Sequence, residues 1–132
     1  MLPLAKLFLG LGALNMFLAV AFGAFGAHAL RDRLTPDLLA IFGTGNQYHF
    51  YHAIGLLIVG MVAIHLPESG LTRWSGWLML VGIIIFSGSL YILSITGIRW
   101  LGAITPIGGV SFLAAWLLLL IAIWRDGGAA GG

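Results

Sequence analysis

The sequence of 132 residues contains no cysteine, which excludes disulfide frameworks, thiolate nucleophiles, cysteine zinc sites and iron–sulfur clusters. Charged side chains are also scarce. They make up 8% of the chain, against about 25% in an average soluble domain. A soluble fold could not cover its surface with so few charges, and 61% of the residues are hydrophobic. The composition therefore predicts a protein that lies in a lipid bilayer.

The net charge of +2 rests on only six basic residues, scattered among the termini and the expected loops. This pattern gives no footprint for nucleic acid, so we expect no nucleic-acid partner and basic residues that contact lipid headgroups. The sequence has no HExxH pattern and no carboxylate inside its apolar stretches. It therefore provides no candidate catalytic residue, and we expect a protein that is not an enzyme.

Four apolar stretches are long enough to cross a bilayer, because a hydrocarbon core about 30 Å thick needs about 20 helical residues. Lipid satisfies no backbone group, and the alternating strands of a membrane barrel are absent, so we expect helices. We predict an all-α membrane protein, an antiparallel bundle of four transmembrane helices in one domain of residues 1–126. The expected spans are residues 7–30, 48–66, 74–94 and 100–124. The glycine-rich residues 127–132 are expected to form a flexible tail.

The first loop is the one long connection between the expected spans. Within it, Thr35 is typical of a helix N-cap, Pro36 of the first helical position and Asp37 of the first turn. Apolar residues follow, and Gly43 and Gly45 would loosen the junction with the second span. We therefore expect a short separate helix in this loop, lying at the membrane interface.

Aromatic residues favour the two membrane interfaces. Tyr48, Tyr51, Tyr91 and Trp100 are expected to mark the first-loop side, whereas Trp116 fits neither interface and is expected to be packed. Lysine and arginine are almost balanced between the two sides. The free amino terminus breaks the balance and predicts that both termini lie in the cytoplasm.

The first span has an alternative interpretation. Lys6, an apolar run and the sequence Ala27-His28-Ala29 resemble a secretory signal with its cleavage site. The apolar run is longer than a signal core and is interrupted by Asn15, so a retained span is favoured. In that span the Asn15 amide must find a partner, and we expect a contact between helices.

Polar side chains within a membrane are functional candidates, because their burial in lipid is costly. Most of them fall near the first-loop side of the expected spans. We predict one polar pocket that opens to this side and is lined by His28, Tyr48, His52, Ser87, Tyr91, Arg99 and Thr105.

Two histidines are candidates for binding a metal ion or haem. His49 and His52 stand at i and i+3 on one helix face, where neutral imidazoles could share a metal ion or bind haem iron, with His28 as a third member. The alternative is that these imidazoles lie near headgroup water and hold nothing. This alternative is favoured, so no metal site and no cofactor is predicted.

Proline and small residues indicate how the helices pack. Pro106 cannot donate a backbone N–H, and we expect it to kink the fourth span. Small residues recur at helical spacing, including Ala19 and Gly23 in the first span and Gly102 and Gly109 in the fourth. Such stripes predict close approach of helices, and they could equally build a homodimer.

Three segments resemble a known family: GAFGAHAL (residues 23–30), Tyr48 with Tyr51-His52-Ala53, and FSGSLYILSITGIRWLGAITPIGG (residues 86–109). They resemble the YgdD-like family of small bacterial inner-membrane proteins, also called domain of unknown function 423, with animal relatives named transmembrane protein 256. The resemblance implies a multi-pass inner-membrane protein and carries over no catalytic residue. Relatives commonly have glutamine at the position of His49, so the resemblance favours His28 and His52 over His49.

Three classes of function are open at this point. The protein could be an accessory, assembly or lipid-contacting protein, a small transporter or channel that uses the polar pocket, or a haem or metal redox protein. The first class is favoured, because the spans lack the carboxylates and ligand sets that the other two usually need. The expected partners are membrane lipids, with a second copy or another membrane protein as further candidates.

Overall fold

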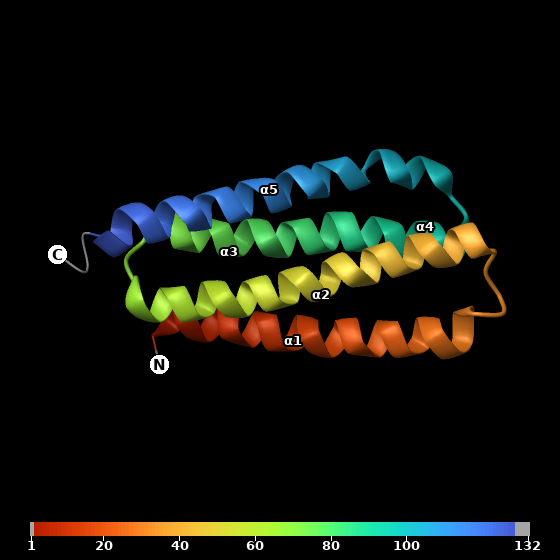
Figure 1. Ribbon diagram of the computed structural model, residues 1–132, viewed down its shortest axis with the longest axis horizontal. Coiled ribbons are helices and arrows are strands. Elements are labelled where there is room, and N and C mark those ends of the chain that lie inside the picture. The colour runs from red at the N-terminus through yellow and green to blue at the C-terminus, as the bar shows by residue number, and fades with distance from the viewer. Residues whose placement is uncertain (1, 129–132) are drawn as a thin grey trace.

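Four long helices run side by side and are joined by short loops at alternating ends in the computed structural model, which describes residues 2–128 (Figure 1). Each is long and apolar enough to span a membrane, and the described residues contain no strand, so the predicted all-helical fold with four spans is confirmed. The elements in chain order are α1 (Pro3–Phe25), the π-helical η1 (Gly26–Leu30), α2 (Pro36–His65), α3 (Gly70–Gly82), the π-helical η2 (Ile83–Ser87), α4 (Gly88–Thr96), the 3-10 helix η3 (Arg99–Ala103), α5 (Thr105–Ile121) and the π-helical η4 (Ala122–Asp126).

The helix ends follow local sequence signals. Ser69 caps α3, since its side chain accepts a hydrogen bond from the Thr72 N–H. Gly97 ends α4 with a φ of 73°, a left-handed conformation that favours glycine. Pro106 lies in the first turn of α5, directly after the 3-10 turns of η3. Its missing N–H therefore falls at a helix start, where it removes no hydrogen bond, instead of kinking the interior of the fourth span.

The first connection differs from the prediction. Thr35 is the N-cap and Pro36 begins the helix as expected, but α2 then continues without interruption to His65. The first turns of α2 are held by packing. The Phe42 ring is buried and occupies the space that a side chain at Gly26 would fill. The expected separate interfacial helix is therefore the beginning of α2, and the loop shrinks to residues 31–35.

The length of α2 changes the depth of its polar residues. The helix has 30 residues, so its midpoint falls between residues 50 and 51, and it is about 45 Å long at about 1.5 Å per residue. With the helix centred in a hydrocarbon core of about 30 Å, Tyr48, His49 and His52 lie near the middle of the membrane. Tyr48 is thus far from the interface at which the sequence pattern placed it.

The first two helices touch through glycine. A Cβ atom on Gly12 would lie 2.8 Å from the Leu57 backbone N, and one on Gly60 would lie 2.8 Å from the Leu9 backbone N. Each helix therefore offers a glycine to the backbone of the other. In lipid, such contacts replace the hydrophobic effect as the force that holds helices together.

The third and fourth long helices approach equally closely. A Cβ atom on Gly108 of α5 would lie 2.4 Å from the Phe86 backbone N in η2, whereas one on Gly109 would meet no atom closer than 3.9 Å. The close contact therefore lies at Gly108. The predicted positions Gly102 and Gly109 have only loose neighbours.

Apolar side chains divide between a small interior and the outer surface. The interior cluster includes Phe8, Leu56, Met79 and Phe112, which come from all four long helices. Many other large apolar side chains are exposed, up to 73% for Leu113. Exposure of this kind is unfavourable in water and is expected on a surface that faces lipid.

Candidate functional site

The residues predicted to line one polar pocket lie at different depths. His28 and Arg99 belong to helix ends at the first-loop side, and Arg99 is about 20 Å from the middle of its helix. Tyr48 and His52 lie within about 4 Å of the middle of α2. The structure therefore distributes the seven residues over several separate environments instead of one pocket.

The two residues at the helix ends are both exposed. His28 lies in η1 with its side chain at the surface. Arg99 donates a hydrogen bond of 2.6 Å to the Asp37 carboxylate, with both side chains more than half exposed. Screening by water and salt makes such pairs weak. This ion pair connects the start of the fourth long helix to the start of α2.

His49 is buried and is the centre of a hydrogen-bond network. Its Nε2 lies 2.9 Å from Asn15 Oδ1 of α1, and its Nδ1 lies 2.9 Å from the Tyr91 hydroxyl of α4. The Asn15 oxygen is an acceptor, so Nε2 carries the proton and Nδ1 accepts from the Tyr91 hydroxyl. One neutral imidazole thus joins three helices near the middle of the membrane.

Asn46 extends this network. Its amide nitrogen donates to the Ala19 carbonyl at 2.9 Å and to the Tyr91 hydroxyl at 3.1 Å. The Asn15 amide nitrogen donates to the Leu11 carbonyl at 2.8 Å. The His49 network, as we call Asn15, Asn46, His49 and Tyr91, therefore joins α1, α2 and α4 through hydrogen bonds. Polar groups satisfied in this way can be buried without a large penalty.

His52 has a different set of partners. Its Nδ1 lies 2.8 Å from the Tyr48 carbonyl of the preceding turn, and its Nε2 accepts a hydrogen bond of 3.0 Å from the Trp116 indole N–H. The ring stacks on Phe112 with a centroid distance of 3.4 Å. Because a carbonyl only accepts, Nδ1 carries the proton and the imidazole is neutral. His52 thus joins α2 to α5.

These contacts decide the metal hypothesis for the histidines. A metal ligand needs a free nitrogen lone pair, yet the acceptor nitrogens of His49 and His52 are taken by Tyr91 and Trp116. His28 lies at the surface of η1 and joins neither imidazole. The described residues contain no cluster of three potential metal ligands. The arrangement fits contacts between helices better than a shared ion.

The remaining predicted pocket residues lie on the third and fourth long helices. The Thr105 and Ser89 hydroxyls are 2.6 Å apart and connect α5 to α4. Ser87 is fully buried in η2, and its hydroxyl has no hydrogen-bond partner among the described residues. Because the Ser87 hydroxyl has no partner among these residues, the cost of burying it is not offset by a hydrogen bond. Ser87 also lies in a π-helical turn, and such turns inside α-helices are frequent at functional positions.

A lipid-facing hollow lies between α2 and α5, and we call it the α2–α5 groove. Its volume is ≈ 500 Å³, which falls within the size range of small-molecule sites, about 300–1,000 Å³. Aromatic rings form most of its wall, and small residues of α5 form one edge. The lining residues are Tyr48, His52, Phe86, Pro106, Gly109, Val110, Phe112, Leu113 and Trp116.

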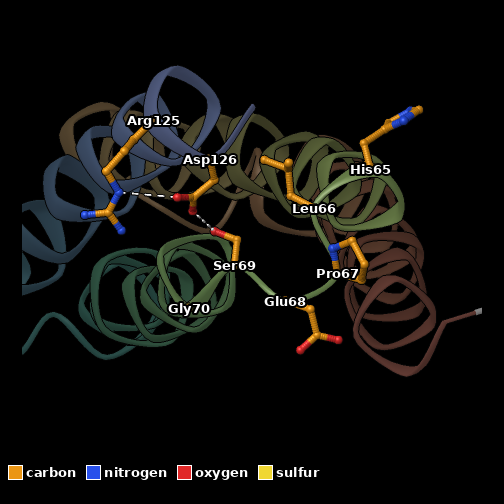
Figure 2. Close-up of a pocket in the computed structure, with 8 residues that line it drawn as sticks. All are labelled: His65, Leu66, Pro67, Glu68, Ser69, Gly70, Arg125 and Asp126. Carbon is orange, nitrogen blue, oxygen red and sulfur yellow. Dashed lines mark hydrogen bonds and ion pairs between the residues drawn. The ribbon is translucent and has the colours of Figure 1, made fainter. Parts of the chain in front are cut away.

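A more polar hollow of ≈ 370 Å³ lies at the end of the molecule where α2 ends and α3 begins (Figure 2). Here the Ser69 hydroxyl donates to one oxygen of the Asp126 carboxylate at 2.5 Å, and Arg125 Nε lies 3.3 Å from the other. The side chain of Glu68 points away from Asp126 (Figure 2). These contacts attach the end of the fourth long helix to the cap of α3, which is a structural role.

Sequence reasoning missed three central residues. Asn46 was not singled out, His49 was ranked below His52, and Trp116 was expected to be packed, with no partner named. A usable signal existed in the start of α2 at Pro36. A helix counted from that residue brings Asn46 and His49 onto one face near the membrane centre, where polar groups must pair.

Comparison with known proteins identifies the family of the chain. The family described as "Protein of unknown function (DUF423)" matches residues 22–109. The "UPF0382 membrane protein YwdK" of Bacillus subtilis is 51% identical over 117 residues, which are 89% of this chain and 95% of that protein. A "UPF0382 membrane protein" of Staphylococcus epidermidis is 48% identical over 127 residues, 93% of this chain and 99% of that protein. No solved structure matches. With these matches and four membrane-spanning helices, the chain is an integral membrane protein that belongs to the DUF423 family.

Proposed function

We propose that the protein is a non-enzymatic integral membrane protein that acts through contacts in the bilayer, as an accessory, assembly or lipid-contacting protein. The observation that carries this proposal is the His49 network. Its hydrogen bonds run between its own side chains and to helix carbonyls, so the network stabilises the contacts between three helices. A surface so rich in exposed apolar side chains then becomes the part that meets lipids, a second copy or another membrane protein.

Two features favour this proposal over transport. The charged carboxylates of the described residues all lie in loops or at helix ends, so the middle of the bundle carries no acid to bind a transported proton or cation. In addition, the polar groups at mid-depth form no single connected set, since His49 and His52 have separate partners and Ser111 donates to the Leu78 carbonyl. Aromatic rings such as Phe22 and Phe112 pack against these imidazoles.

A reconstitution experiment tests the proposal. Purified protein in liposomes that contain a pH-sensitive dye should give the proton and potassium flux of empty liposomes, and His49→Ala should not change it. The same sample should show no Soret absorption after growth with added haem precursor. A protein-dependent flux that His49→Ala abolishes, or a stoichiometric haem spectrum, would replace the proposal with transport or redox function.

We further propose that the protein lies in the bacterial inner membrane with both termini in the cytoplasm. Both relatives named above are bacterial membrane proteins. The start of α1 and the end of η4 lie at one end of the bundle (Figure 1). Lys6, Arg73 and Arg125 are on that side and Arg31, Arg33 and Arg99 are on the other, so the free amino terminus is the one further positive charge that favours this orientation. A C-terminal alkaline phosphatase fusion should be inactive and a C-terminal green fluorescent protein fusion should be bright; the reverse pattern would overturn this orientation.

A further inference from the structure

The α2–α5 groove lies at the middle of the membrane. Tyr48 and His52 are within about 4 Å of the midpoint of α2, and Phe112 is at the midpoint of the fourth long helix, which covers 28 residues from Arg99. The hydrocarbon core extends about 15 Å to either side. The ester and phosphate oxygens of phospholipids therefore lie above or below the groove and not inside it.

The groove is continuous with the lipid-facing surface. Two of its lining residues, Val110 and Leu113, are 64% and 73% exposed, and Leu117 one turn further along α5 is also exposed. A molecule dissolved in the bilayer can thus enter from the side. Gly109 leaves space at this edge, since a Cβ atom there would meet only the Phe86 ring at 3.9 Å.

One residue that lines the groove has an unused hydrogen-bond donor. The polar atoms of His52 and Trp116 are taken by their mutual hydrogen bond and by the Tyr48 carbonyl. The Tyr48 hydroxyl, in contrast, makes no hydrogen bond within residues 2–128, and its side chain is 37% exposed. An unpaired hydroxyl in hydrocarbon is unfavourable, because lipid tails cannot satisfy it. A ligand that carries an acceptor at this depth would remove that penalty.

We propose that the α2–α5 groove binds a neutral, membrane-dissolved molecule with a planar ring, a ring carbonyl and a hydrocarbon tail, as in a quinone lipid. The carbonyl accepts a hydrogen bond from Tyr48, and the ring stacks against the aromatic wall that includes Phe86 and Trp116. The ligand is neutral, because no charged side chain lines the groove. No electron transfer is part of the proposal. The site would be a means of sensing or holding such a molecule.

This inference deepens the proposed function and rests on it, since a protein that acts through contacts in the bilayer needs a surface with a preferred ligand. Tryptophan fluorescence can test it, because quinones quench indole emission and Trp116 lines the groove. The protein for the test keeps Trp116 and replaces Trp74, Trp77, Trp100 and Trp124 by Phe. It is placed in phosphatidylcholine vesicles and titrated with decyl-benzoquinone.

Saturable quenching is expected, on top of the linear quenching by quinone dissolved in the lipid. Gly109→Leu should fill the groove and leave only the linear part. Gly10→Leu, on an open face of α1 where a Cβ atom meets nothing within 4 Å, is the matched control and should keep saturation. Tyr48→Phe should weaken binding about fivefold, the expected effect of one lost hydrogen bond.

Three results would overturn the inference. Quenching that is linear in every variant means that the quinone only partitions into lipid. Equal competition by decylbenzene, together with no effect of Tyr48→Phe, means that the groove takes a plain acyl chain. Saturable self-association that Gly109→Leu abolishes, without saturable quenching, means that a second copy covers the groove. Absence of binding leaves the proposed function standing, whereas protein-dependent flux in the same vesicles would remove the proposed function itself.

Discussion

His49 and Asn15 connect α2 to α1 by a hydrogen bond of 2.9 Å near the middle of the bilayer. The two residues are both buried and are 34 positions apart in the chain. Because the other imidazole nitrogen bonds to Tyr91, the position of α1 is linked to that of α4 through a single side chain. Mutating this pair therefore measures how much polar contacts between helices contribute to the stability of the bundle.

A double-mutant cycle measures this contribution. His49→Ala leaves the Asn15 oxygen without its donor and the Tyr91 O–H without its acceptor. We expect it to lower the free energy of unfolding by about 1–3 kcal/mol. The coupling energy between His49→Ala and Asn15→Ala should be about 0.6–1.7 kcal/mol, the range for hydrogen bonds between membrane helices. Steric trapping in bicelles gives both values. His65→Ala at the exposed end of α2 is the control, and strictly additive effects at positions 15 and 49 would contradict the network.

Two neighbouring glycines of α5 should respond very differently to the same change. Gly108→Ala places a Cβ atom 2.4 Å from the Phe86 backbone N, so the helices must separate, and we expect a loss of about 1–3 kcal/mol or more. Gly109→Ala places its Cβ atom 3.9 Å from the Phe86 ring, an ordinary contact, and the better helix propensity of alanine should make it neutral or slightly stabilising. Thermal unfolding in detergent distinguishes them. Equal effects would mean that the close contact is elsewhere.

The two buried histidines should be neutral with opposite tautomers. His49 donates from Nε2 to Asn15, whereas His52 donates from Nδ1 to the Tyr48 carbonyl. Nitrogen-15 NMR of histidine-labelled protein in nanodiscs should therefore show two protonated nitrogens of different type, assigned through His49→Gln and His52→Gln. Trp116→Phe should shift the Nε2 signal of His52 alone. The same tautomer at both positions would contradict the hydrogen bonds described here.

Fluorescence can also check the depth of the helices. Trp116 lies within about 6 Å of the middle of the fourth long helix, whereas Trp124 lies near its end. In single-tryptophan proteins, lipids brominated near the chain end should quench Trp116 most strongly, and lipids brominated near the headgroup should quench Trp124. The opposite order would mean that the bilayer is not centred on the helices.

The sequence predicted the number and type of the spans because apolar runs, loop charges and the Thr35-Pro36 signal are local features. It misplaced the polar groups because the start of span two was set by hydropathy, at Tyr48, twelve residues after the helix begins at Pro36. An error of that size in membrane depth places Arg99 and His52 in one predicted pocket, although they lie far apart in the structure.

Partners across helices were beyond reach for a different reason. That Asn15 needed a partner follows from its burial in lipid, but which residue supplies it depends on how far each helix is rotated and shifted. Gly12 and Gly108 set that geometry, because a Cβ atom on either would lie less than 3 Å from a backbone nitrogen of the neighbouring helix. The sequence showed several glycines at helical spacing and could not distinguish tight positions from open ones.

The order of the chain gives the His49 network a consequence for membrane insertion. The second span is the least apolar of the four and carries Asn46 and His49 in its middle. Its first partner, Asn15, has already been synthesised when α2 emerges, and the loop of residues 31–35 keeps the two helices adjacent. The second partner, Tyr91, follows 42 residues later. If the first two helices insert together as a hairpin, His49 Nε2 can pair with Asn15 at once. His49 Nδ1 gains its partner Tyr91 only when the third long helix inserts.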